Sequence, residues 1–197
     1  MKTMLVLSMG ALLLAGTLSA QTPVPEWQAG VDKMKSLIQT NPAQASEEVG
    51  ELLKGKNKKN VDLVTSVAHV YLDAGKLTEA QEYLAMAKKA NNKDPKVSVL
   101  EGDIALAQKN IGQACQLYEQ AIYFDPNCKE AYLKYAQAYK SASPALAIEK
   151  LEQLKAVDPN CLEADRELAE VYYSSNRFGK AAAVSYTHLT LPTNREV

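Results

Sequence analysis

The sequence predicts an all-α fold, a right-handed superhelical solenoid of antiparallel helix pairs. Ala80, Ala114, Ala147 and Ala181 recur at intervals of 34, 33 and 34 residues, and each follows a turn-like segment by a few residues. Apolar residues around each alanine follow the helical period of about 3.6 residues. An interval of this length holds two antiparallel helices and their turns, so we expect neighbouring pairs to stack.

The composition fits one soluble domain and excludes several classes of protein. Of the 197 residues, 47% are hydrophobic and 23% are charged, and 22 basic residues face 23 acidic ones. This near neutrality argues against a nucleic-acid partner, because binding to phosphates needs a basic surface. Nine Gly, eight Pro and three Cys exclude a collagen-like chain and a disulfide-dense scaffold.

Residues 1–20 are predicted to be a secretory signal peptide. Lys2 supplies the positive start, Met4 to Gly16 is apolar, and small residues lead to Ala20. The apolar run is shorter than the ~20 residues that span a bilayer, so no transmembrane span is expected. We therefore expect export to the periplasm or cell envelope of a bacterium, with an uncleaved anchor as the alternative.

Residues 21–60 are predicted to form a leading helix pair. Trp27, Val31, Met34 and Ile38 have helical spacing, and Ala45, Val49, Leu52 and Leu53 continue it in a second helix. Asn41 is expected to cap that second helix with Pro42 in its first position. We expect Gly55 to end it in the left-handed conformation, ahead of a solvated Lys-rich linker. An anionic-surface contact of that linker is the alternative.

Three full units follow at 61–94, 95–128 and 129–161, and a truncated fourth unit at 162–183. Each has a small residue at its eighth position: Ala68, Gly102, Ala136 and Ala169. Small residues there and at the recurring alanines let paired helices cross closely. Large residues, including Tyr71, Tyr139 and Tyr172 at position 11, fill the remaining space.

This pattern resembles the tetratricopeptide repeat, with its spacing W-x2-L-G-x2-Y, then A-x3-F, then P, over about 120 residues. Pro126 and Pro159 stand at the ends of units, whereas no unit has Trp at position 4, and Glu101 and Ala105 replace large residues. The resemblance implies a scaffold without catalytic activity that binds a protein or peptide partner. The alternative is a module of a larger envelope protein whose catalytic, sensor or anchoring domain is missing.

The family also implies a concave binding face from positions 2, 5, 9, 12 and 13 of each first helix. The positions are Asp62, Thr65, His69, Leu72 and Asp73; Lys96, Val99, Asp103, Leu106 and Ala107; Glu130, Leu133, Gln137, Lys140 and Ser141; and Glu163, Arg166, Glu170, Tyr173 and Ser174.

Acidic residues outnumber basic ones in this set, and its apolar centre is Val99, Leu106 and Leu133. We expect a partner segment with apolar anchors and a few basic residues. Thr65 and His69 stand where some relatives have a Lys-and-Asn clamp for chaperone tails, which disfavours that ligand. The alternative is that position 12 is partly buried and the face is merely solvated.

Residues 184–197 resemble one translated frame of a sequencing adapter, and a native tail with a β-like segment is the alternative. Ser185 and His188 occupy positions where a large and a small apolar residue belong. We therefore expect the first helix of the fourth unit, about 162–175, to lack a partner helix. Leu168, Ala169 and Tyr172 would then be exposed.

Few residues suggest reactive chemistry, and we expect no cofactor and no metal. His69 with Asp73 four residues later makes at most half of a metal site. Cys128 and Cys161 share one repeat position, about 10 Å apart in stacked pairs, which is too far for a disulfide. Cys115 follows an anchor alanine and is predicted to be core filler, so three free thiols are expected.

Overall fold

The computed structural model describes residues 24–189, and within them every regular element is helical. The elements are α1 (Gln28–Leu37), α2 (Pro42–Leu52), the 3₁₀ helix η1 (Gly55–Lys59), α3 (Val61–Asp73), α4 (Leu77–Asn91), α5 (Pro95–Ala107), α6 (Ile111–Phe124), α7 (Lys129–Tyr139), α8 (Pro144–Val157), α9 (Leu162–Ser174) and α10 (Phe178–Leu189). Successive helices pair as α1 with α2 through to α9 with α10. The predicted all-α solenoid of helix pairs is confirmed.

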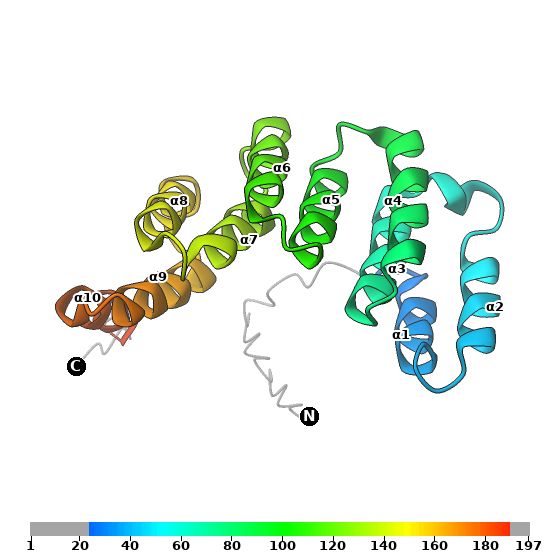
Figure 1. Ribbon diagram of the computed structural model, residues 1–197, viewed down its shortest axis with the longest axis horizontal. Coiled ribbons are helices and arrows are strands. Elements are labelled where there is room, and N and C mark those ends of the chain that lie inside the picture. The colour runs from blue at the N-terminus through cyan, green and yellow to red at the C-terminus, as the bar shows by residue number, and fades with distance from the viewer. Residues whose placement is uncertain (1–23, 190–197) are drawn as a thin grey trace, which may run out of the picture.

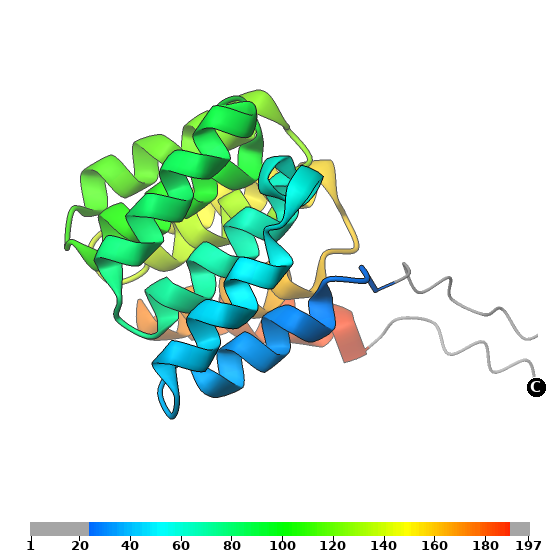
Figure 2. The same cartoon turned by 90° about the vertical axis from the view of Figure 1, so that its right-hand side faces the viewer.

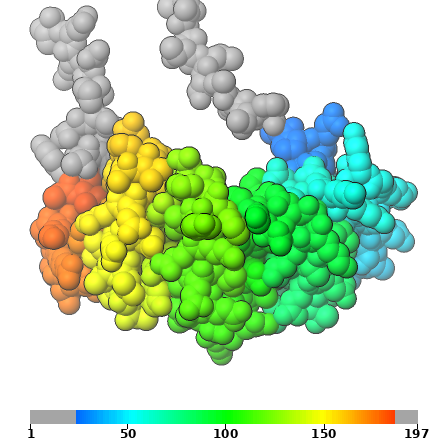
Figure 3. Space-filling view, turned by 90° about the horizontal axis from the view of Figure 1, so that it is seen from above, coloured from blue at the N-terminus to red at the C-terminus, as the bar shows by residue number. Residues whose placement is uncertain are grey.

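The pairs stack into an arch with the odd-numbered helices on its inner side (Figure 1). Helices α3, α5, α7 and α9 contact one another in sequence, whereas the even-numbered helices contact mainly the odd-numbered ones. The side view shows the pairs layered one behind another (Figure 2), and the space-filling view shows the succession of layers from one end to the other (Figure 3). The inner side is therefore a continuous surface of first helices.

Local sequence signals fix where the helices begin. The Asn41 side chain accepts a hydrogen bond from the Gln44 N–H and Pro42 occupies the first turn, as predicted for α2. Asn60 and Asn110 cap α3 and α6 in the same way. Each cap satisfies an amide that has no partner inside its helix.

The turn inside a pair needs a left-handed residue at the same place in three units. Gly75, Lys109 and Asn176 have φ of 74°, 64° and 60°. In each, the following N–H bonds back to a carbonyl near the end of the preceding helix, as from Lys76 to Tyr71. Gly55 also has a φ of 59°, as predicted, and the linker after it is exposed to solvent but forms the 3₁₀ helix η1.

The small residues of the repeat lie in the core, where paired helices cross. Ala68 and the recurring Ala80, Ala114 and Ala147 are fully buried. A Cβ at Gly102 would stand 2.5 Å from the Tyr118 ring, so this position requires glycine for its pair to close. The neighbouring residue, Glu101, is atypical of the repeat. Its carboxylate lies 2.6 Å from the ammonium of Lys88 in the previous unit.

The prediction that the fourth unit lacks its second helix is wrong. Helix α10 runs from Phe178 to Leu189, through the expected boundary at 183, and packs against α9. It covers the inner helix, so Leu168 and Tyr172 are buried, and Ala169 is half-buried. The alanine-rich start favours helix, and the Ser185 hydroxyl donates to the Ala181 carbonyl, which satisfies a polar group where an apolar one was expected.

The first helix pair covers the opposite end of the stack. Its helices α1 and α2 bury Val31, Met34 and Val49 against the core of the first full unit. Together with α10, this pair protects the apolar surface that a stack of repeats would otherwise expose.

Two sequence predictions lie outside the described residues, the signal peptide at 1–20 and most of the adapter-like segment, 190–197. Among residues 24–189, no helix combines the length and hydrophobicity that a membrane span requires.

The three cysteines are free thiols in the structure. Cys115 is buried among core residues of the second and third units, as predicted, and Cys161 is also buried. Burial raises the pKa of the Cys115 thiol from its ordinary 9.0 to about 11. The thiolate fraction at neutral pH therefore falls about a hundredfold.

We expect Gly102→Ala to destabilise the protein by about 1–3 kcal/mol, because the added methyl overpacks against Tyr118. Gly50→Ala in α2 is the matched control, since a Cβ there meets no atom within 4 Å. That control should stabilise the protein by up to about 1 kcal/mol through helix propensity. Urea unfolding measures both variants, and equal effects would contradict the close-approach argument.

We also expect Cys115 and Cys161 of the native protein to resist a thiol reagent such as Ellman's reagent at pH 8. Both are buried and burial raises both pKa values. All three cysteines should react in 6 M guanidinium chloride. Fast labelling of Cys115 in the folded state, located by mass spectrometry, would show that the second pair is not closed.

Candidate binding groove

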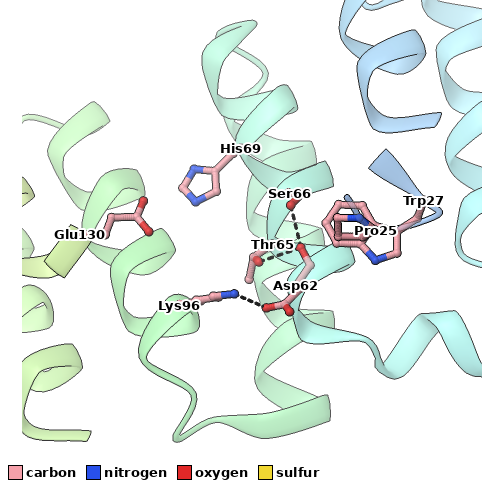
Figure 4. Close-up of a pocket in the computed structure, with 8 residues that line it drawn as sticks. All are labelled: Pro25, Trp27, Asp62, Thr65, Ser66, His69, Lys96 and Glu130. Atoms are coloured by element: carbon pink, nitrogen blue, oxygen red, sulfur yellow. Dashed lines mark hydrogen bonds and ion pairs between the residues drawn. The ribbon is translucent and has the colours of Figure 1, made fainter. Parts of the chain in front are cut away.

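Two adjoining pockets lie on the inner face over α3, α5 and α7. The first has a volume of about 340 Å³ and is lined by Pro25, Trp27, Asp62, Thr65, Ser66, His69, Lys96 and Glu130 (Figure 4). The second has a volume of about 300 Å³ and is lined by His69, Leu72, Asp73, Asp103, Leu106, Ala107 and Lys134. His69 lines both, so the pockets form one feature, which we call the groove.

Helix geometry explains why these residues meet. Asp62, His69 and Asp73 fall on the inner stripe of α3, and Lys96 and Glu130 start the next two inner helices. The segment at Pro25 and Trp27 closes the first pocket from the other side (Figure 4). The groove therefore combines residues from the leader and three successive units.

Hydroxyl groups in the first pocket are already engaged. Thr65 donates to the Val61 carbonyl at 2.8 Å, and Ser66 donates to the Asp62 carbonyl at 2.7 Å. The Lys96 ammonium lies 2.5 Å from the Asp62 carboxylate, and this hydrogen bond raises the pKa of Lys96. The first pocket thus offers few unpaired donors.

Asp103 is expected on the binding face but is a buried structural residue. Its side chain is 7% exposed, and it accepts hydrogen bonds from the Tyr118 hydroxyl at 2.7 Å and the Lys134 ammonium at 3.0 Å. His69 Nδ1 stands 3.7 Å from one of the Asp103 carboxylate oxygens. Burial raises the pKa of Tyr118, which keeps the phenol protonated as a donor.

We call Asp103, Tyr118, Lys134 and His69 the Asp103 cluster. It joins α3, α5, α6 and α7, four helices of three successive units. Sequence reasoning missed Tyr118 and Lys134 as partners, because no local pattern pairs residues 15 and 31 positions away.

The remaining predicted residues divide by exposure. Thr65 and Val99 are buried, so Val99 is not part of an accessible apolar centre. His69, Leu72, Leu106, Leu133 and Lys140 are half-buried. The exposed residues are Asp62, Asp73, Lys96, Ala107, Glu130, Gln137, Ser141, Glu163, Arg166, Glu170, Tyr173 and Ser174.

Beyond the groove, several ion pairs lie on the inner face over α7 and α9. Lys140 lies 2.9 Å from Glu170, and Lys129 lies 3.5 Å from Glu163. Buried Glu167, which sequence reasoning did not single out, accepts from Gln137 at 3.2 Å and has Lys140 and Arg166 within 3.9 Å. These positions hold neighbouring first helices together.

The described residues contain no group of three or more His, Cys, Asp or Glu side chains arranged to bind a metal ion. His69 does not form the suggested pair with Asp73 on its own helix, because its imidazole lies beside Asp103 of the next inner helix.

Comparison with known proteins agrees with the repeat architecture. The tetratricopeptide repeat family model matches residues 67–128 and 137–189. No match was found among curated protein sequences.

Solved structures share the fold at low sequence identity. The thermophilic TPR protein TTC0263 of Thermus thermophilus is 18% identical over 85% of this chain and 92% of that one, with a TM-score of 0.63. Pseudomonas aeruginosa pilF is 19% identical over 80% and 72%, with a TM-score of 0.60. The first TPR of Spaghetti (RPAP3), solved with the HSP90 peptide SRMEEVD, is 18% identical over 60% and 95%, with a TM-score of 0.51.

We expect Lys134→Met to destabilise the protein by about 1–3 kcal/mol, because it leaves the buried Asp103 carboxylate without its cation. Lys129→Met is the control, since Lys129 and its partner Glu163 are both exposed and such pairs contribute about 0–1 kcal/mol. Urea unfolding at neutral pH compares them. A loss at Lys129 as large as that at Lys134 would contradict a special role for the Asp103 cluster.

Proposed function

The chain belongs to the tetratricopeptide repeat family, and we propose that it is an exported scaffold without catalytic activity that binds a protein or peptide segment in the groove. The groove itself carries the proposal. Two adjoining pockets run over three first helices, and their walls mix half-buried apolar side chains with exposed charges. Such a surface suits an extended segment that inserts apolar anchors between polar contacts.

Half-buried Leu72 and Leu106 supply the apolar contacts in the second pocket, and exposed Ala107 leaves room above them. These side chains come from α3 and α5, which pack against each other through buried apolar residues, so the pocket is formed before a partner arrives. A preformed pocket lowers the entropic cost of binding.

A chaperone tail that ends in acidic residues does not suit this groove. The Thr65 hydroxyl donates to its own helix, and Lys96 is paired with Asp62, so neither is a free donor for a carboxylate. The peptide bound to Spaghetti is of that acidic kind, and we propose different ligand chemistry for this chain.

Export is the second part of the proposal, and the support is the amino-terminal sequence. Lys2 followed by the apolar run Met4 to Gly16 and small residues up to Ala20 fits a secretory signal. Partners in a bacterial periplasm or envelope are therefore proposed.

We expect Ala107→Trp to block the groove. A library of random 12-residue peptides displayed on phage is panned against the full chain, and the tightest peptide is measured by fluorescence anisotropy. The indole fills the second pocket from an exposed position at the end of α5, so affinity should fall at least tenfold. The protein should still fold, as circular dichroism would show.

Ala85→Trp is the matched control, because Ala85 is an exposed alanine on the outer helix α4. It should leave affinity within twofold of the parent. A peptide that binds all three proteins equally, or loses affinity with Ala85→Trp alone, would overturn the groove as the binding site. A library that yields no binding peptide would count against peptide binding itself.

A further inference from the structure

On the inner face, the basic side chains are paired more completely than the acidic ones. Its basic side chains are Lys96, Lys129, Lys134, Lys140 and Arg166, and each lies within ion-pair distance of an acidic side chain of the chain. Glu130 and Asp73 are exposed acids that lie within ion-pair distance of no described cation, although Glu130 faces the Lys96 ammonium across the first pocket and helps to raise its pKa. Glu130 lines the first pocket of the groove and Asp73 lines the second. The unsatisfied charge of the groove is therefore negative.

The first pocket places an aromatic wall opposite one of these acids. Trp27 and Glu130 stand on opposite sides of the pocket, with the Asp62–Lys96 pair between them and His69 above (Figure 4). An indole face and a carboxylate on facing walls of one pocket each favour a guanidinium or ammonium group.

Packing holds Trp27 in this position. It caps α1 and packs against the core of the leading units. It also lines a third pocket of about 320 Å³ whose other lining residues include Glu26, Glu48 and Glu51. Glu48 and Glu51 are paired with lysines, whereas Glu26 has no ion pair to a described residue. Acidic groups thus border the indole in both pockets.

We propose that the partner segment carries at least two basic side chains, one placed between Trp27 and Glu130 and the other beside Asp73. This inference rests on the proposed peptide-binding function and adds the chemistry of the ligand. The Asp103 cluster and the Asp62–Lys96 pair are internally neutralised, so a cationic ligand meets the two free carboxylates. The same carboxylates would repel an anionic segment.

The places of the two acids on their helices guide the spacing of the two basic residues. Asp73 is the last residue of α3 and Glu130 the second residue of α7, so the two acids lie near opposite ends of their inner helices. Eleven helical positions, the difference between their places in the repeat, span about 16 Å. An extended segment covers that distance with about five residues or more.

Three phage libraries of 12-residue peptides test the inference. In each, two positions six residues apart are fixed as Arg and Arg, Glu and Glu, or Gln and Gln, and the other ten are random. The full chain is panned with the three libraries side by side. The Arg library should be enriched at least tenfold over the other two.

The double variant Glu130→Gln, Asp73→Asn should lose most of the Arg-library enrichment, because both substitutions remove charge from exposed, unpaired positions. Glu82→Gln is the matched control, an exposed acid without an ion pair to a described residue on the outer helix α4, and it should leave enrichment unchanged. Enrichment that survives the double variant would overturn the placement at these carboxylates.

The outcomes separate this inference from the proposed function. If the Gln or Glu library is enriched as strongly as the Arg library, and Ala107→Trp abolishes that enrichment, peptide binding in the groove stands and the basic-ligand inference fails. If no library is enriched, or if Ala107→Trp leaves every enrichment unchanged, peptide binding in the groove is itself overturned.

Discussion

The contact of Gly102 with Tyr118 is the constraint on which the middle of the solenoid depends. The absence of a side chain at Gly102 lets α6 approach α5 until the Tyr118 ring fills the crossing, and its hydroxyl then reaches Asp103. Lys134 from the next unit and His69 from the previous unit close around the same carboxylate. One small residue thereby sets packing within a pair and between three units.

This arrangement separates structural charge from charge available to a partner. Carboxylates buried between units, Asp103 and Glu167, are neutralised by lysines of the third unit. Leaving either without a cation costs free energy, because a buried carboxylate loses its hydration. Glu130 and Asp73 lie outside these contacts, so their charge remains exposed to solvent.

The sequence by itself determined the features that depend on local interactions and on the repeat. Helical spacing, the Asn41 cap before Pro42 and the small residues at fixed positions predicted the helices and their pairing. Two polar positions, Ser185 and His188, led to the wrong expectation for α10, because helix propensity over the whole alanine-rich stretch outweighs single polar residues.

Only the tertiary structure decided which inner-face residues are accessible. Asp103 on α5 is buried and Glu130 on α7 is exposed, although both fall on the inner stripe of their helices, and periodicity does not distinguish them. Their exposure depends on side chains from other units, such as Lys134, and on the path by which Trp27 enters the fold. These are contacts between distant positions, and a single sequence carries no local signal for them.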